Sequence, residues 1–187
     1  MKISLIIVFV AILSVAFLSV HADVQVKKTA PPSVEVEKSP SQAEKLVRSP
    51  LKDLMIKNEV ETAVSMLQAI YVKYQQKEMT LKQAKKLGAD LLRELRYGSE
   101  GYFWADTTNG VNVVLYGKKD VEGKSRLQNK DKNGEFYIKD FLTQGIAGGG
   151  YVEYLFSKKG QTKSLPKRSY VLLFKPFGWV VGTGYYL

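Results

Sequence analysis

The stretch of sequence from Gly101 to Tyr116 reads GYFWADTTNGVNVVLY and predicts a β-hairpin. Aromatic and β-branched residues, which favour strands, lie on both sides of Asn109-Gly110. Asparagine and glycine tolerate the positive φ angles that a tight hairpin turn requires. Because helix-forming sequence precedes this stretch and strand-like runs follow it, we expect it to supply the first strands of an antiparallel sheet.

Two helices are predicted upstream of the hairpin. Residues 51–78 carry apolar side chains at intervals of three and four, as an amphipathic helix does. Thr80 and Gln83 match a capping box that begins a second helix, and Gly98 is placed to end it. The first helix is expected to bury Met55, Val60, Ala63, Val64, Leu67, Ile70, Tyr71 and Tyr74. The second is expected to bury Leu81, Ala84, Leu87, Leu91, Leu92 and Leu95.

The sequence after the hairpin predicts a loop, a short helix and more strands. Residues 117–134 are rich in lysine and turn-forming residues, which indicates a surface loop with little core. A helix is expected over residues 135–143, and strands over residues 151–156, 169–174 and 178–186. This order of elements predicts an α+β domain, in which a five-stranded antiparallel sheet carries the helices.

The start of the chain predicts a targeting segment and a linker. Residues 3–20 are an apolar run, and small residues precede a possible cut after Ala22. We expect residues 1–22 to be a secretory signal peptide or an uncleaved membrane anchor, which places the rest of the chain outside the cytoplasm. Proline and charged residues make residues 23–50 a predicted disordered linker, so that residues 51–187 form the folded domain.

Composition limits the chemistry that this chain can perform. It has 187 residues, no cysteine, and a single histidine, His21, inside the predicted leader. A mature domain would therefore lack disulfides, cysteine ligands and a histidine general base, which argues against an enzyme. The net charge of +10 favours anionic partners, but the lysines are scattered, as on an ordinary soluble surface.

Polar motifs with a possible chemical role are few. Gly182-Thr-Gly184 resembles part of a dinucleotide loop, but no helix follows it to receive a phosphate. The carboxylates show no spacing that specifies paired acid–base work. Asp106 precedes the hairpin turn, where we expect it to cap backbone amides.

The aromatic residues suggest a pocket. Tyr102 and Trp104 share one face of the first strand, because side chains alternate along a strand. Together with Lys167, Arg168 and Ser169, aromatic residues of the later strands could line an apolar pocket that holds a cation and hydroxyl groups. Such a pocket suits a small carboxylate. The later aromatic residues are Tyr151, Tyr154, Tyr170, Phe174 and Trp179.

Several spaced motifs together resemble the single Cache domain, second subfamily. They are Leu95–Trp104, the Asn109-Gly110 turn, Pro166–Val171 and Phe177–Tyr185, and the resemblance covers residues 51–187. It implies a PAS-like five-stranded antiparallel sheet behind a long N-terminal helix, with a second helix packed on it. It also implies a periplasmic domain that senses small organic acids for chemoreceptors and sensor kinases.

The resemblance carries over to particular residues. It matches Tyr102 and Trp104 to an aromatic strand of the family, and Lys167, Ser169 and Tyr170 to a pocket-forming segment. The candidate ligand-binding set is Tyr102, Trp104, Tyr154, Lys167, Ser169 and Tyr170. Members of the family often carry His-Pro where this chain has Tyr116-Gly117. Members of the family usually continue into a signalling domain, whereas the sequence here stops at Leu187. We therefore expect a stand-alone module.

We therefore expect a secreted or envelope-tethered sensory module that binds a short organic acid without catalysis, cofactor or metal. Its expected partners are the small carboxylate and a membrane receptor or sensor protein, with no nucleic acid. A homodimer through the long N-terminal helix is a further expectation. One alternative is a basic structural protein that adheres to anionic polymers or membrane surfaces. Another is an enzyme that uses carboxylate, lysine or tyrosine chemistry.

Overall fold

The computed structural model describes the backbone from Gln42 to Leu187, and the side chains from Ser49 onward. The predicted leader lies outside the described residues, as does most of the predicted linker. Helix α1 (Gln42–Gln75) begins within the last residues of the predicted linker and includes Pro50. In this described part of the chain, no helix is both long enough and apolar enough to cross a membrane.

The fold is α+β, as the order of elements predicts. Its other helices are α2 (Leu81–Glu94), the short 3-10 turn η1 (Lys119–Val121) and α3 (Tyr137–Ile146). The strands are β1 (Arg96–Tyr97), β2 (Gly101–Tyr102), β3 (Trp104–Thr107), β4 (Asn112–Leu115), β5 (Gly150–Ser157), β6 (Ser164–Phe174) and β7 (Trp179–Tyr186). An antiparallel five-stranded sheet has the order β4-β3-β7-β6-β5. Strands β1 and β2 form a separate pair that the sequence analysis did not predict.

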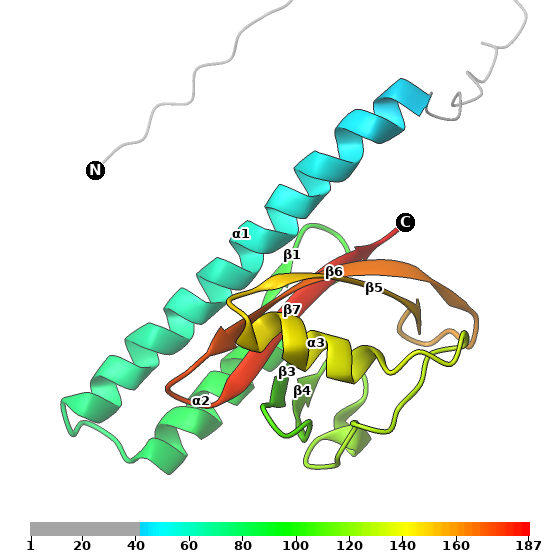
Figure 1. Ribbon diagram of the computed structural model, residues 1–187. Coiled ribbons are helices and arrows are strands. Elements are labelled where there is room, and N and C mark those ends of the chain that lie inside the picture. The colour runs from blue at the N-terminus through cyan, green and yellow to red at the C-terminus, as the bar shows by residue number, and fades with distance from the viewer. Residues whose placement is uncertain (1–41) are drawn as a thin grey trace, which may run out of the picture. The chain divides into compact units, whose positions relative to one another are not determined.

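The sheet is covered on both faces, as Figure 1 shows. Helix α1 packs along one face, with α2 beside it, and α3 packs on the opposite face. Alternation along each strand divides the core accordingly. Val181 of β7 belongs to the cluster under α1 and α2, whereas its neighbour Val180 belongs to the cluster under α3. The α3 side of the sheet is called the inner face below.

The predicted hairpin is present and is formed by β3 and β4. The amide of Gly110 donates to the carbonyl of Thr107 at 2.8 Å, and Gly110 has a φ of 77°. Glycine adopts this left-handed conformation at little steric cost, which explains Gly110 at the turn, whereas Asn109 does not have a positive φ. A β-bulge between Ala105 and Asp106 shifts the register of the two strands.

Helix α2 begins as predicted but ends earlier, and the face that it buries is confirmed only at Ala84 and Leu92. Thr80 and Gln83 form the capping box, whereas α2 ends at Glu94, and Gly98 lies in the β1–β2 turn. The prediction that Leu81, Leu87 and Leu91 face inward is wrong: they are exposed, and the buried residues are Ala84, Gly88 and Leu92. A Cβ atom on Gly88 would lie 2.8 Å from Leu67, so small residues let α2 approach α1 closely.

Asp106 lies in a buried ion pair and does not cap the hairpin turn. Arg126 donates to Asp106 from Nε at 2.9 Å and also from Nη2, and Asn112 donates to Asp106 at 3.0 Å. Both members of the ion pair are buried. The prediction of little core in the loop of residues 117–134 therefore fails at Arg126. A local sequence pattern could not show this contact, because it joins residues 20 positions apart.

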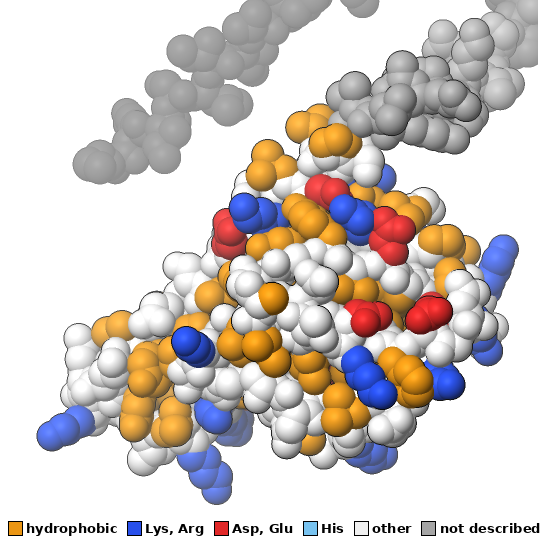
Figure 2. All heavy atoms as spheres, in the orientation of Figure 1, with side chains coloured by type: hydrophobic (Ala, Val, Ile, Leu, Met, Phe, Trp, Pro, Cys, Tyr) orange, Lys and Arg blue, Asp and Glu red, His pale blue; other side chains and the backbone are white. Residues whose placement is uncertain are grey.

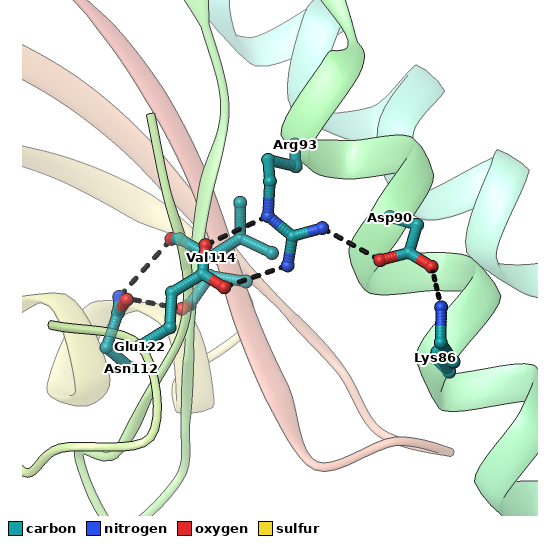
Figure 3. A network of polar contacts seen from close by, with 7 residues as sticks. Lys86, Asp90, Arg93, Asn112, Val114 and Glu122 are labelled. Atoms are coloured by element: carbon teal, nitrogen blue, oxygen red, sulfur yellow. Dashed lines mark hydrogen bonds and ion pairs between the residues drawn. The ribbon is translucent and has the colours of Figure 1, made fainter. Parts of the chain in front are cut away.

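The ion pairs of Arg93 lie closer to the surface than that of Arg126. Arg93 of α2 donates to Glu122 at 3.0 and 2.8 Å and to Asp90 at 2.8 Å, which ties α2 to the loop after β4 (Figure 3). On the face shown in Figure 2, lysine and arginine side chains are dispersed among other residues. This dispersal agrees with the scattered lysines of the sequence.

We expect the substitution Arg126→Leu to destabilise the domain by about 3–5 kcal/mol, because it leaves the Asp106 carboxylate buried without a counter-charge. The free energy of unfolding from urea titration measures this loss. Arg93→Leu, at a more exposed ion pair, is the matched control and should cost about 1 kcal/mol or less. Equal losses for both variants would contradict the assignment.

Candidate functional site

The structure brings most of the predicted ligand-binding residues together on the inner face. Tyr102 and Trp104 reach it from β2 and β3, Tyr154 from β5, and Lys167 and Ser169 from β6. The β-sheet register explains the arrangement, because residues paired across neighbouring strands point to the same face. Lys167 is paired with Tyr154 on one side and with Tyr186 on the other.

Lys167 is the centre of this cluster. Its Nζ atom donates to the hydroxyl of Tyr102 at 2.7 Å. It also lies 4.3 Å from the ring centroid of Tyr102, 5.1 Å from that of Tyr186 and 5.5 Å from that of Phe156. Aromatic faces therefore surround the amine, and such contacts favour its protonated form.

Burial opposes that preference. The Lys167 side chain is 1% exposed, and none of the described carboxylates forms an ion pair with it. Desolvation lowers the pKa of Lys167 to about 7. The amine can therefore gain or lose its proton near neutral pH, and its charge has no fixed partner in the described part of the chain.

Two glycines of β7 make room for the other members of the cluster. A Cβ atom on Gly182 would lie 2.3 Å from the Trp104 ring, and one on Gly184 would lie 2.2 Å from the Ser169 hydroxyl oxygen. The glycines of Gly182-Thr-Gly184 therefore serve close packing within a strand. Ser169 also shares a hydrogen bond of 3.1 Å with the buried Tyr154 hydroxyl.

Trp104 lies under α3 with an unused hydrogen-bond donor. Its ring stacks on Phe141 with centroids 4.3 Å apart. Its Nε1 atom is buried and has no hydrogen-bond partner among the described residues. An unpaired buried donor is costly in a protein interior, so this nitrogen is available to a ligand oxygen or a water molecule.

The structure does not bring Tyr170 to this cluster. Its side chain lies on the opposite face of the sheet, where it packs near Ile56 and Val60 of α1. Arg168 also points to that face and donates to Asp53 of α1 at 2.8 and 3.0 Å. Arg168 and Tyr170 are one and three residues from Lys167 along β6, so their side chains point to the face opposite to that of Lys167. The alternation of side chains along a strand could have shown this from the sequence.

Several inner-face residues were missed by the sequence analysis. Tyr186 is paired with Lys167 across β6 and β7, and alternation along the last strand could have identified it. The others line the inner space beside Tyr102, Trp104 and Tyr154: they are Leu115, Arg126, Tyr137, Phe141 and Phe156. Leu115 ends β4, and Phe156 lies on β5 in phase with Tyr154, so alternation along β5 could have identified Phe156. The positions of Arg126, Tyr137 and Phe141 depend on the packing of α3 and of the loop before it, which a local pattern does not show.

The inner space is almost filled by these side chains. Its free volume is about 10 Å³, barely enough for one water molecule. Several larger cavities border the described residues. Two of them, of about 250 and 340 Å³ and called the outer cavities below, are lined by Tyr102, which also lines the inner space. Another, of about 260 Å³, is lined by Tyr154 and Lys167. Tyr116, which stands where members of the family often carry His-Pro, lines the smaller outer cavity. The centroids of the Tyr116 and Tyr102 rings are 5.4 Å apart.

No group of three or more histidine, aspartate or glutamate side chains could hold a metal ion in the part of the chain that the structure describes. The inner face instead offers hydroxyl groups, an indole N–H and the Lys167 amine, which are hydrogen-bond donors suited to the oxygens of a carboxylate. The arrangement can bind an anion, and its aromatic walls can hold a small apolar tail.

Comparison with known proteins agrees with this geometry. The family model described as Single Cache domain 2 matches residues 49–187. The sensor histidine kinase MctS of Rhizobium johnstonii is 32% identical over 136 residues, which are 73% of this chain and 29% of the kinase. The methyl-accepting chemotaxis protein McpP of Pseudomonas putida is 26% identical over 105 residues, 56% of this chain and 19% of the receptor. The chain thus spans less than a third of either relative.

Solved structures show the same fold. A periplasmic sensor domain of a chemotaxis protein superposes with a TM-score of 0.69 at 28% identity, covering 80% of this chain and 99% of that domain. A Cache chemosensory domain described for its recognition of carboxylic acids gives a TM-score of 0.72 at 28% identity, covering 79% of this chain and 99% of that domain.

The buried amine predicts a pH-dependent stability. Below pH 7 Lys167 is protonated in both the folded and the unfolded chain, so the full cost of burying its charge is present. Between pH 7 and about 10.5 the unfolded chain binds more protons, so wild-type stability should rise with pH. We expect Lys167→Met to be more stable than wild type by about 2–4 kcal/mol below pH 6, with a difference that shrinks as pH rises.

Urea titrations at several pH values measure this difference. The exposed Lys163 provides the matched control, and Lys163→Met should differ from wild type by a small, constant amount. A pH-independent difference for Lys167→Met would show that the amine is not desolvated.

Proposed function

The chain belongs to the single Cache domain 2 family, and on this premise we propose that it is an extracytoplasmic sensory module that binds a short organic acid at Lys167 without catalysis. In this proposal the carboxylate of the ligand pairs with the Lys167 amine. The hydroxyl groups and the indole N–H of the inner face hold its oxygens, and the aromatic rings enclose its short tail.

The observation that carries the proposal is the buried amine without a counter-charge. Lys167 has aromatic and hydroxyl neighbours but no carboxylate partner among the described residues. A buried ion is stabilised strongly by an opposite charge within hydrogen-bond distance. A ligand carboxylate would supply that charge and would keep Lys167 protonated. The similar Cache domain described for carboxylic acid recognition supports the choice of ligand class.

The filled inner space requires a side chain to move. A free volume of about 10 Å³ holds at most one water molecule, so it is too small for a carboxylic acid. Tyr102 is the best candidate to move, because it is only half-buried and borders the inner space and both outer cavities. We propose that the ligand carboxylate replaces the Tyr102 hydroxyl at Lys167.

Binding, rather than chemistry on the ligand, is supported by the groups present. The inner face holds a lysine, tyrosines and a serine, and its carboxylate, Asp106, is already paired with Arg126. No described carboxylate faces Lys167 as a partner for proton transfer to a substrate. These features favour a recognition site over a catalytic one.

The relatives suggest the wider role. One is a sensor histidine kinase and another a chemotaxis receptor, and the similar structures include a periplasmic sensor domain. We propose that this domain also lies outside the cytoplasm, with residues 1–22 as its leader or anchor. Its occupancy would be reported to a membrane receptor or sensor protein, and dimerisation through α1 remains part of the proposal.

A ligand panel tests the proposal on the full chain. Acetate, propionate, lactate and pyruvate are titrated by calorimetry at pH 6.5 and pH 8.5, with melting temperatures measured in parallel. At least one acid should bind and raise the melting temperature. Its affinity should fall by about tenfold at the higher pH, because Lys167 must take up a proton to pair with the carboxylate.

Variants locate the binding site. Lys167→Met should weaken binding at pH 6.5 by about tenfold or more, since it removes the charged partner of the ligand. Lys163→Met, an exposed lysine near the same strand, should leave the affinity unchanged. Absence of binding for every acid, or full affinity in Lys167→Met, would reject the proposed function.

A further inference from the structure

The smaller of the two outer cavities, called the outer cavity below, has its own aromatic and cationic walls. Its volume is about 250 Å³, just under the roughly 300 Å³ at which pockets for drug-sized ligands begin. It therefore suits a molecule with a single ring. The walls that matter here are Tyr102, Tyr116, Tyr186, Glu100, Lys158 and Lys159.

Tyr116 is held in an electropositive setting at this cavity. Lys159 donates to its hydroxyl at 3.0 Å and lies 4.2 Å from its ring centroid. The guanidinium of Arg96 lies 3.7 Å from the same centroid. The hydrogen bond from Lys159, followed by the contact with Arg96, lowers the pKa of Tyr116. The ring is thus fixed in place by cations, with Tyr102 as its aromatic neighbour.

The charges of the outer cavity favour an anion. Glu100 is the acidic group of the wall, and Lys158 pairs with it at 2.8 Å while lying 5.3 Å from the Tyr186 ring centroid. This pair leaves the charge of Lys159 uncompensated by any described carboxylate, and Arg96 adds a further positive charge behind Tyr116. The hydrogen bond of Lys159 to a phenol leaves its other donors free for a ligand.

We propose that the outer cavity is a second binding site, separate from Lys167, for the anion of a planar aromatic acid. The carboxylate pairs with Lys159, and the ring of the ligand packs against the rings of Tyr116 and Tyr186. Aromatic rings attract one another in offset or edge-on contacts, which a saturated tail cannot make. Unlike the inner space, the outer cavity is already large enough for a single ring without movement of Tyr102.

Matched ligands test the chemistry of the site. Benzoate is titrated into the full chain by calorimetry, beside benzamide, which has the same shape without the charge, and cyclohexanecarboxylate, which has the charge without a planar ring. Benzoate should bind about tenfold more tightly than either of the others, because only benzoate satisfies both the cation and the tyrosine rings.

Variants separate this site from the one at Lys167. Tyr116→Leu and Lys159→Met should each weaken benzoate binding by about tenfold, while Lys167→Met should change it less than about twofold. Neither outer-cavity variant should alter the binding of a short acid. Lys163→Met serves again as the control for loss of one exposed charge. Lys159 is exposed, so its variant is expected to fold even if Tyr116→Leu does not.

Each remaining outcome rejects the second site. Equal affinities for benzoate, benzamide and cyclohexanecarboxylate would show that the outer cavity recognises neither the charge nor the planar ring of the ligand. Loss of benzoate binding in Lys167→Met would show a single, merged site. Binding of short acids at Lys167 without any benzoate binding would reject the outer site while leaving the proposed function intact. Failure of all these acids to bind would reject both.

Discussion

The structure depends on the alternation of side chains along β6, a strand that is paired on both edges. Because β5 and β7 hold it in register, each β6 residue must point either to α3 or to α1. Lys167 and Ser169 face α3, whereas Arg168 and Tyr170 face α1. A shift of the pairing by one residue would turn Arg168 and Tyr170 toward α3 and would turn Lys167 and Ser169 toward α1.

The adjacent residues Lys167 and Arg168 point to opposite faces of the sheet, and the charge of only one of them is neutralised. On the α1 face, Arg168 is partly exposed and is neutralised by Asp53 and Glu153, and Tyr185 also donates to Asp53 at 2.9 Å. On the inner face, its neighbour Lys167 is buried without a neutralising group among the described residues. The first arrangement attaches α1 to the sheet, and the second costs stability while leaving a cation for an anionic ligand.

Local chemistry explains which parts of the fold could be predicted. The turn at Asn109-Gly110 and the capping box at Thr80 depend on residues close in sequence, so their patterns were sufficient. The prediction for α2 was right at Ala84 and Leu92 but wrong at Leu81, Leu87 and Leu91, because Gly88 lies against Leu67 of α1 and those leucines are exposed. The residues of α2 that are buried depend on how closely α2 can approach α1, and the hydrophobic pattern of α2 does not show this distance.

The order of elements, the hairpin, the family and the residue types available for binding could all be predicted from the amino-acid sequence. Strand alternation, which is a local rule, places Lys167 and Ser169 on one face of β6. Their meeting with Tyr102, Trp104 and Tyr154 depends on the register between strands. The folded chain was also needed to show that Lys167 is buried without a counter-charge, that Arg126 reaches Asp106, and that the inner space is nearly filled. These features arise from contacts between residues far apart in the chain, and packing of α3 and the loops against the sheet creates them.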